Sequence, residues 1–72
     1  MPPLDRLLTA ADLPTLKVGE LVYVLWSGGN WPHQYVVIRE GRNPWVVVPG
    51  FSAPQHPLEF VGPPPLTAVW RA

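Results

Sequence analysis

The fold is decided by one stretch of the sequence, Val18-Gly19-Glu20-Leu21-Val22-Tyr23-Val24-Leu25-Trp26-Ser27-Gly28-Gly29-Asn30-Trp31-Pro32. Its first part is a run of β-branched, aromatic and aliphatic residues, which favours a strand. Its second part contains glycine, asparagine and proline, which favour a change of chain direction. The stretch therefore predicts the first strand and the first loop of a small β-domain.

Further runs of the same kind follow, and glycine, proline or asparagine separates them. Strands are predicted at residues 20–26, 34–40, 45–49, 57–61 and 67–70, with connections at 27–33, 41–44 and 50–56. The first and third strands are apolar at successive positions, so one face is expected to line the core and the other to meet a further surface. That surface is either the N-terminal segment or a second subunit.

Residues 1–16 are predicted to be a helical segment that precedes the β-domain of residues 17–72. Between residues 3 and 13, apolar residues recur at the spacing of one face of a helix; they are Leu4, Leu7, Leu8 and Ala11. In the alternative interpretation, a single turn begins at Thr9, with Asp12 in a capping-box-like position. Pro14 is expected to end the helix in both versions.

The run Pro63-Pro64-Pro65 has two interpretations, a polyproline recognition motif and a rigid corner before the last strand. The corner is favoured because no PxxP continuation exists and a strand-like run follows at once. Most other prolines lie in the N-terminal part or between the predicted strands, where they do not interrupt strand pairing.

Composition limits the classes of partner. The chain has 72 residues, and its 5 basic side chains balance 5 acidic ones, so no basic stripe is available for phosphates and nucleic acid is disfavoured. Charged residues make up 14% of the chain, against a usual value of about 25%. The surface is therefore expected to be apolar and to contact a partner protein or a second copy.

The absence of cysteine excludes disulfides and thiolate metal sites, and it fits a cytoplasmic location. The longest apolar runs are far shorter than the ~20 residues that a membrane-spanning helix needs. The first residues, Met1-Pro2-Pro3, do not resemble a signal peptide. A soluble protein without a membrane partner is expected.

The pattern Gly19-Glu20-x-Val22-x-Val24-x-Trp26-Ser27, followed by a glycine loop and Trp31-Pro32, resembles the opening of Tudor and PWWP domains. Trp45-Val46-Val47-Val48-Pro49-Gly50-Phe51 is similar to the third strand of a Tudor domain and the turn after it. The resemblance covers residues 18–66 and implies an SH3-like barrel. Together with the predicted strands and the N-terminal helical segment, the expected fold is an all-β, SH3-like (Tudor-like) barrel of five strands that is partly open and carries a short N-terminal helix.

In that family an aromatic box at the barrel rim binds methylated lysine or arginine through cation–π attraction. The resemblance places Trp26, Trp31 and Phe51 at three positions of such a box. The chain departs from the pattern at Pro49, where the family has an aromatic residue, and at Ala53, where it has a polar one. The resemblance therefore implies an incomplete box.

The partner-binding residues predicted from these arguments are Tyr23, Trp26, Trp31, Trp45 and Phe51. A structural role competes with each of them, because aromatic side chains also fill small cores. Trp31 is expected to be the more exposed indole, since it stands in a loop that contains glycine and proline, where functional contacts tend to lie. The predicted function is a non-catalytic interaction module that binds a protein or peptide partner at the barrel rim.

Catalysis, metal binding and a cofactor are not predicted. His33 and His56 are expected to be loop residues in solvent, and no spacing supplies them with a third metal ligand. Glu59 is expected to be a solvated carboxylate, and Ser27 and Ser52 lack a histidine at a known motif spacing. The glycine–tryptophan loop is also similar to that of the type II dihydrofolate reductases, but the segment 58–61 lacks their active-site glutamine and tyrosine.

Two alternative functions stay open. In the first, the chain is a self-assembling structural subunit, either as a homo-oligomer or within a larger complex such as a viral one. In the second, it is a small-barrel nucleic-acid binder. Arg39 and Arg42 would then hold the phosphates, and Trp31 or Trp45 would stack on bases.

Overall fold

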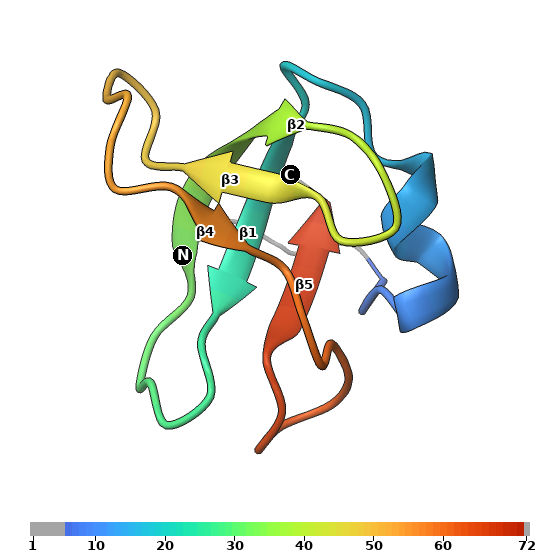
Figure 1. Ribbon diagram of the computed structural model, residues 1–72. Helices are drawn as coiled ribbons and strands as arrows, with labels where there is room; N and C mark the ends of the chain where they lie inside the picture. Colours follow the sequence, from blue (N-terminus) through green and yellow to red (C-terminus); the bar gives the residue numbers. More distant parts are fainter. Residues whose placement is uncertain (1–5, 72) are drawn as a thin grey trace.

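The computed structural model describes residues 6–71 and contains one antiparallel sheet (Figure 1). Its elements are a 3₁₀ helix η1 (Ala10–Thr15) and the strands β1 (Leu21–Leu25), β2 (His33–Arg39), β3 (Trp45–Val47), β4 (His56–Pro57) and β5 (Ala68–Arg71). The strand order is β4-β3-β2-β1-β5. The prediction of a mostly β domain with five strands and a short helix is confirmed. The edge strands β4 and β5 do not pair with each other, so the sheet is not closed into a barrel.

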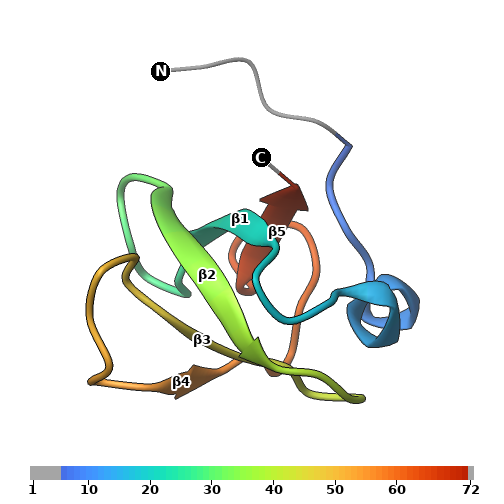
Figure 2. The same ribbon diagram turned by 90° about the horizontal axis from the view of Figure 1, so that it is seen from above.

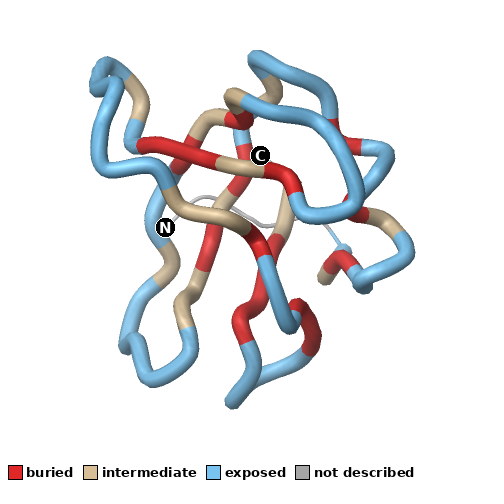
Figure 3. Tube along the Cα trace, viewed as in Figure 1, coloured by how far each residue is buried: buried red, intermediate tan, exposed pale blue. Residues whose placement is uncertain are grey.

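The core lies on one face of this sheet. Burial alternates along β1, where Val22 and Val24 are fully buried and Tyr23 is half-buried. This alternation is the period of two expected of a strand with one covered face. The buried cluster is completed by Leu8, Leu13, Leu16, Tyr35, Val37, Val46, Leu58, Val61 and Val69. In Figure 3 most of the strand positions are buried or intermediate, and the exposed positions lie mainly in the connections, which also carry some buried positions.

The sheet is strongly curled. Trp26 follows β1 and His56 lies in β4, yet their ring centroids are 5.4 Å apart. In a flat sheet, strands with a neighbour spacing of about 4.8 Å would place β4 about 14 Å from β1. The inner side chains therefore converge, and Tyr35 of β2 completes the contact with centroids 5.6 Å from Trp26 and 6.2 Å from His56. Figure 2 shows β2 twisting across the molecule between β1 and β3.

The predicted helix over residues 3–13 is wrong for the part that the structure describes. Leu7 pairs with Trp70 in an antiparallel bridge, and the N–H of Leu8 donates to the carbonyl of Val69 at 2.8 Å. Leu7 and Leu8, two of the residues that suggested a helical face, instead extend the sheet beyond β5. Residues 3–5, including Leu4, lie outside the described residues.

The alternative helix start at Thr9 is confirmed. Thr9 is the N-cap of η1, and the carboxylate of Asp12 accepts hydrogen bonds from the N–H of Thr9 at 2.8 Å and from its hydroxyl at 3.1 Å. Pro14 does not end the helix, because it lies inside η1. Proline disrupts a longer helix through its missing N–H and its ring, but η1 is a 3₁₀ helix of 6 residues that ends one residue after Pro14.

The fourth predicted strand is also shorter than expected. β4 ends at Pro57, after which the N–H of Leu58 donates to the carbonyl of Pro44 and the side chain of Leu58 enters the core. Phe60 then adopts a φ of 53°, a left-handed conformation that ends any strand geometry. After Phe60, the corner expected at Pro63-Pro64-Pro65 is confirmed by hydrogen bonds from Gly62 N–H to Thr67 O and from Leu66 N–H to Pro63 O.

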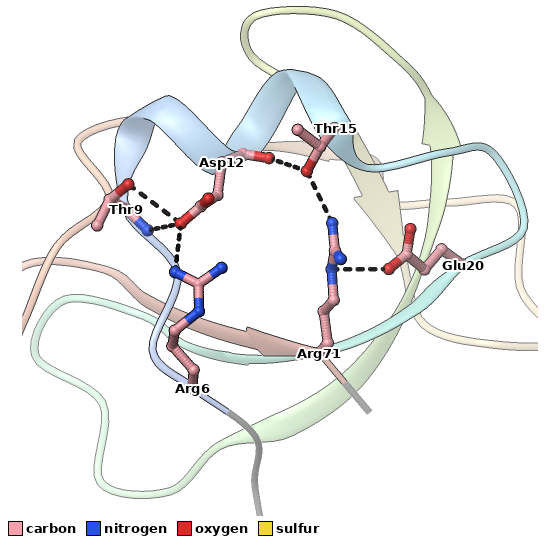
Figure 4. A network of polar contacts seen from close by, with 6 residues as sticks. All are labelled: Arg6, Thr9, Asp12, Thr15, Glu20 and Arg71. Atoms are coloured by element: carbon pink, nitrogen blue, oxygen red, sulfur yellow. Dashed lines mark hydrogen bonds and ion pairs between the residues drawn. The ribbon is translucent and has the colours of Figure 1, made fainter.

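A polar network holds η1 against the sheet (Figure 4). Arg71 of β5 donates to the hydroxyl of Thr15 at 2.7 Å, and its Nε lies 3.1 Å from a carboxylate oxygen of Glu20. The Nε has no aligned hydrogen-bond acceptor, so the second contact is an ion pair. At the other end of η1, Arg6 donates to the carboxylate of Asp12 at 3.1 Å. The network joins the end of the chain to the helix and to the start of β1.

The Asp12 contacts predict an acid-dependent loss of stability. Hydrogen bonding from the Thr9 N–H, followed by the Arg6 side chain, holds the pKa of Asp12 below its ordinary value. Because the folded-state pKa is the lower one, the stabilisation is present at neutral pH and is lost as the pH falls below about 4. Urea unfolding at a series of pH values should therefore show a weaker acid dependence for Asp12→Asn than for the wild type. The same acid dependence in both proteins would contradict this account.

Both edges of the sheet are protected against the addition of another strand. The edge strand β4 is two residues long and contains Pro57, which has no N–H to donate. At the other edge, Leu7 and Leu8 occupy the free side of β5. A partner is therefore expected to contact side chains rather than the backbone. Within residues 6–71 no helix has the length and apolar character needed to cross a bilayer.

Candidate binding site

The turn after β3 presents Phe51. In the sequence Val48-Pro49-Gly50-Phe51 the N–H of Phe51 donates to the carbonyl of Val48 at 3.0 Å, and Gly50 has a φ of 88°. Proline at the second position and a positive φ at the third are the signature of a type II turn, which glycine adopts without strain. The turn directs the chain away from the sheet, and Phe51 is 66% exposed.

Phe51 borders a hollow of about 350 Å³, which we name the Phe51 groove; it is lined by Ile38, Arg39, Val47, Phe51, Ser52 and Gln55. The volume is within the range of about 300–1,000 Å³ that is typical of ligand pockets. Ile38 and Val47 supply apolar surface from β2 and β3. Ser52 and Gln55 supply polar groups, and Gln55 Nε2 donates to the Ser52 carbonyl at 3.3 Å, which holds the loop in a turn.

Arg39 gives the Phe51 groove its positive charge. Its guanidinium carbon lies 5.6 Å from the centroid of the Trp45 ring, within cation–π distance. The two residues are paired neighbours on β2 and β3, at a register shift that follows Val37. The indole of Trp45 orients the guanidinium, whose edge remains able to donate to a carboxylate.

A second hollow, which we name the Phe60 hollow, has a volume of about 430 Å³ and is lined by Ala10, Leu13, Arg42, Asn43, Glu59, Phe60 and Val61. It lies between η1, the connection of β2 to β3, and the segment after β4. In Figures 1 and 2, η1 and the β3–β4 connection lie on opposite sides of the molecule, with the strands between them. Phe60 is 83% exposed, the highest value among the exposed large hydrophobic residues of the described chain.

Phe60 is absent from the sequence-based prediction. No periodicity marks it, because the segment 57–61 looks like a strand in which Phe60 would be one alternating position. In the structure it is the one residue other than glycine, within 6–71, that has a positive φ. A bulky residue in this conformation is rare, and such outliers concentrate at functional sites.

The structure separates the five predicted partner-binding residues. Trp26 packs against the core, and its Nε1 donates to the hydroxyl of Tyr35 at 2.9 Å. Trp31 is 62% exposed in the first loop, as expected, but makes no ring contact with another described aromatic residue. Tyr23 lies on the outer face of the sheet, paired with Trp70. Trp45 and Phe51 both belong to the surroundings of the Phe51 groove, Trp45 through Arg39.

The arginines of the nucleic-acid alternative do not line one site. Arg39 lines the Phe51 groove, and Arg42 lines the Phe60 hollow, where Glu59 adds a negative charge. A carboxylate beside Arg42 opposes the binding of a phosphate. The structure therefore supports nucleic-acid binding less than the closeness of residues 39 and 42 in the sequence does.

The expectation that His56 is a loop residue in solvent is wrong, because His56 lies half-buried in β4 against the Trp26 and Tyr35 rings. His33 is exposed at the start of β2. Within the described residues, no group of three histidine, aspartate or glutamate side chains is placed to hold a metal ion. Searches among protein families, characterised proteins and solved structures found no significant match to this chain.

Proposed function

We propose that this protein is a non-catalytic interaction module that binds a peptide segment of a partner protein in the Phe51 groove. One observation carries the proposal. A rigid turn holds an exposed phenylalanine over an apolar floor and beside an arginine that an indole orients. Apolar surface with a few placed polar groups is the usual composition of a binding site.

We extend the proposal to the fold and the location. The curled sheet, with β5 beside β1 and the rings of Trp26, Tyr35 and His56 in contact, supports an SH3-like, Tudor-like barrel that is partly open. The lack of cysteine supports a cytoplasmic location.

The groove favours a particular peptide chemistry. Ile38, Val47 and Phe51 would hold an aliphatic or aromatic side chain, which contributes about 25 cal/mol for each Å² of apolar surface removed from water. Arg39 would donate hydrogen bonds to the carboxylate of a neighbouring aspartate or glutamate of the peptide, or to that of its C-terminus. An extended segment with an apolar residue beside an acidic one fits both requirements.

Selection from a displayed library of random short peptides tests the proposal. Peptides selected by the wild type are expected to share an apolar residue next to an acidic one. Phe51→Ala should weaken their affinity by about tenfold or more, because an exposed aromatic anchor is a typical hot spot. Because the side chain of Phe51 is 66% exposed, the midpoint of thermal unfolding of the Phe51→Ala variant should stay close to that of the wild type.

The matched control is Phe60→Ala, which removes another exposed phenylalanine ring, one that lines the other hollow. This variant should bind the selected peptides as the wild type does. The proposal fails if Phe51→Ala retains full affinity, or if every selected peptide depends on Phe60 instead.

Self-association is a second candidate function, and one observation favours it. The outer face of the sheet carries Leu21, which is 40% exposed, beside its paired neighbour Val36, which is half-buried. A face of this kind can meet the same face of a second copy. Light scattering over a range of concentrations decides the matter, since a constant monomer mass excludes this candidate.

A further inference from the structure

The charged side chains of the structure are almost all engaged. Four basic residues have partners: Arg6 with Asp12, Lys17 with Glu40, Arg71 with Glu20, and Arg39 with the Trp45 ring. Within residues 6–71, Arg42 is the one basic side chain, and Glu59 the one acidic side chain, without a hydrogen bond, an ion pair or a ring contact.

These two free charges line the same cavity, the Phe60 hollow, and do not pair with each other. Between them the hollow has an apolar lining from Ala10 and Leu13 of η1 and from Val61. The exposed ring of Phe60 stands beside it. The hollow thus combines a cation, an anion and apolar surface within about 430 Å³.

We propose that the Phe60 hollow is a second binding site, which takes a peptide segment with one acidic and one basic side chain flanking an apolar side chain. The acidic side chain pairs with Arg42 and the basic one with Glu59. The apolar side chain packs on Leu13, Val61 and the ring of Phe60. The site shares no lining residue with the Phe51 groove.

Charge complementarity decides between this occupant and others. A phosphate or a nucleic-acid backbone would meet Arg42 but would be repelled by Glu59. A purely apolar ligand would cover both charges and remove them from water without a partner, which is unfavourable. A segment with one acidic, one basic and one apolar side chain provides a partner for Arg42, for Glu59 and for the apolar surface of the hollow.

Charge reversal provides the test. The probes are capped pentapeptides with the central order basic–leucine–acidic or acidic–leucine–basic, titrated into isotopically labelled protein and followed by the amide shifts of residues 6–71. The wild type is expected to prefer one order, with shifts centred on residues 10–13, 42–43 and 59–61. The double variant Arg42→Glu with Glu59→Arg should prefer the opposite order.

Single changes complete the design. The substitutions Arg42→Gln and Glu59→Gln should each lower the affinity for the preferred peptide by about two- to fivefold, which is the range for solvent-exposed ion pairs. Phe60→Ala should weaken the binding of both orders as read from the shifts of residues 10–13, 42–43 and 59–61. Phe51→Ala should leave these shifts unchanged, even where the same peptides also shift residues of the proposed Phe51 groove, because the two sites share no lining residue. The inference is overturned if no peptide shifts residues 10–13, 42–43 and 59–61, if the order preference does not reverse, or if Phe51→Ala abolishes the shifts of these residues.

Discussion

Leu58→Ala is expected to lower the thermal midpoint by more than about 10 °C. Leu58 is 0% exposed and lies where the chain leaves β4 for the core. Removing a buried leucine side chain costs about 2–5 kcal/mol, and 1 kcal/mol shifts the midpoint of a domain of this size by about 4–8 °C. Small domains are only marginally stable, so the loss is a large fraction of the total. Thermal and urea unfolding followed by tryptophan fluorescence measure it.

Leu66→Ala is the matched control for this measurement. Leu66 is 47% exposed at the proline corner, so the same substitution should change the free energy of unfolding by less than about 1 kcal/mol. If the two variants had equal stability, the side chain of Leu58 would not be part of the core.

Trp26→Ala is expected to destabilise the protein by about 2–3 kcal/mol. The indole is half-buried against the core, and its removal leaves the hydroxyl of the buried Tyr35 without its donor at 2.9 Å. It also removes the ring contacts with Tyr35 and His56, which hold the curled sheet together across β1, β2 and β4. Both losses lower the free energy of unfolding, which chemical denaturation measures.

Comparing the stability of Trp26→Ala with that of Trp31→Ala shows which of the two indoles belongs to the core and which to the surface. Trp31 is 62% exposed, so its removal should change stability by no more than about 0.5 kcal/mol. Equal destabilisation by the two substitutions would place Trp31 in the core and contradict the structure. If Trp31 contributes to partner binding, as the sequence predicts, its loss should affect affinity alone.

The sheet could be predicted because strand periodicity is a local property. The alternation around Val22 and Val24 and the turn residues after Trp26 place β1 and β2 within one residue of their observed bounds. The outward position of Tyr23 follows from the same alternation. These features depend on neighbours in the sequence, which a pattern can represent.

The segments that the sequence misplaced are controlled by distant contacts. The spacing of Leu7 and Leu8 fits a helix equally well, and pairing with β5 decides the outcome. Leu58 leaves the strand pattern because Pro44, from another part of the chain, accepts its N–H. Such tertiary contacts override local preference, and a single sequence gives no direct measure of them.

The candidate sites show the same division. The resemblance to a Tudor turn picks out Phe51 as a binding residue, and the structure shows its ring 66% exposed after the Pro-Gly turn. The partners of Phe51 in its groove, including Ile38 and Gln55, come from three separate segments of the chain. The Phe60 hollow likewise joins residues near 10, 42 and 60, so its free charges become neighbours only in the folded state.

The antiparallel bridge between Leu7 and Trp70 has a consequence for engineering. Because the strands run in opposite directions, residues 6 and 71 leave the bridge next to each other. The domain can therefore be inserted into an exposed loop of a host protein, because its two attachment points are as close together as the two ends of such a loop. A short glycine–serine link between the same two points would allow circular permutation, with new termini opened in the first loop near Gly28 and Gly29.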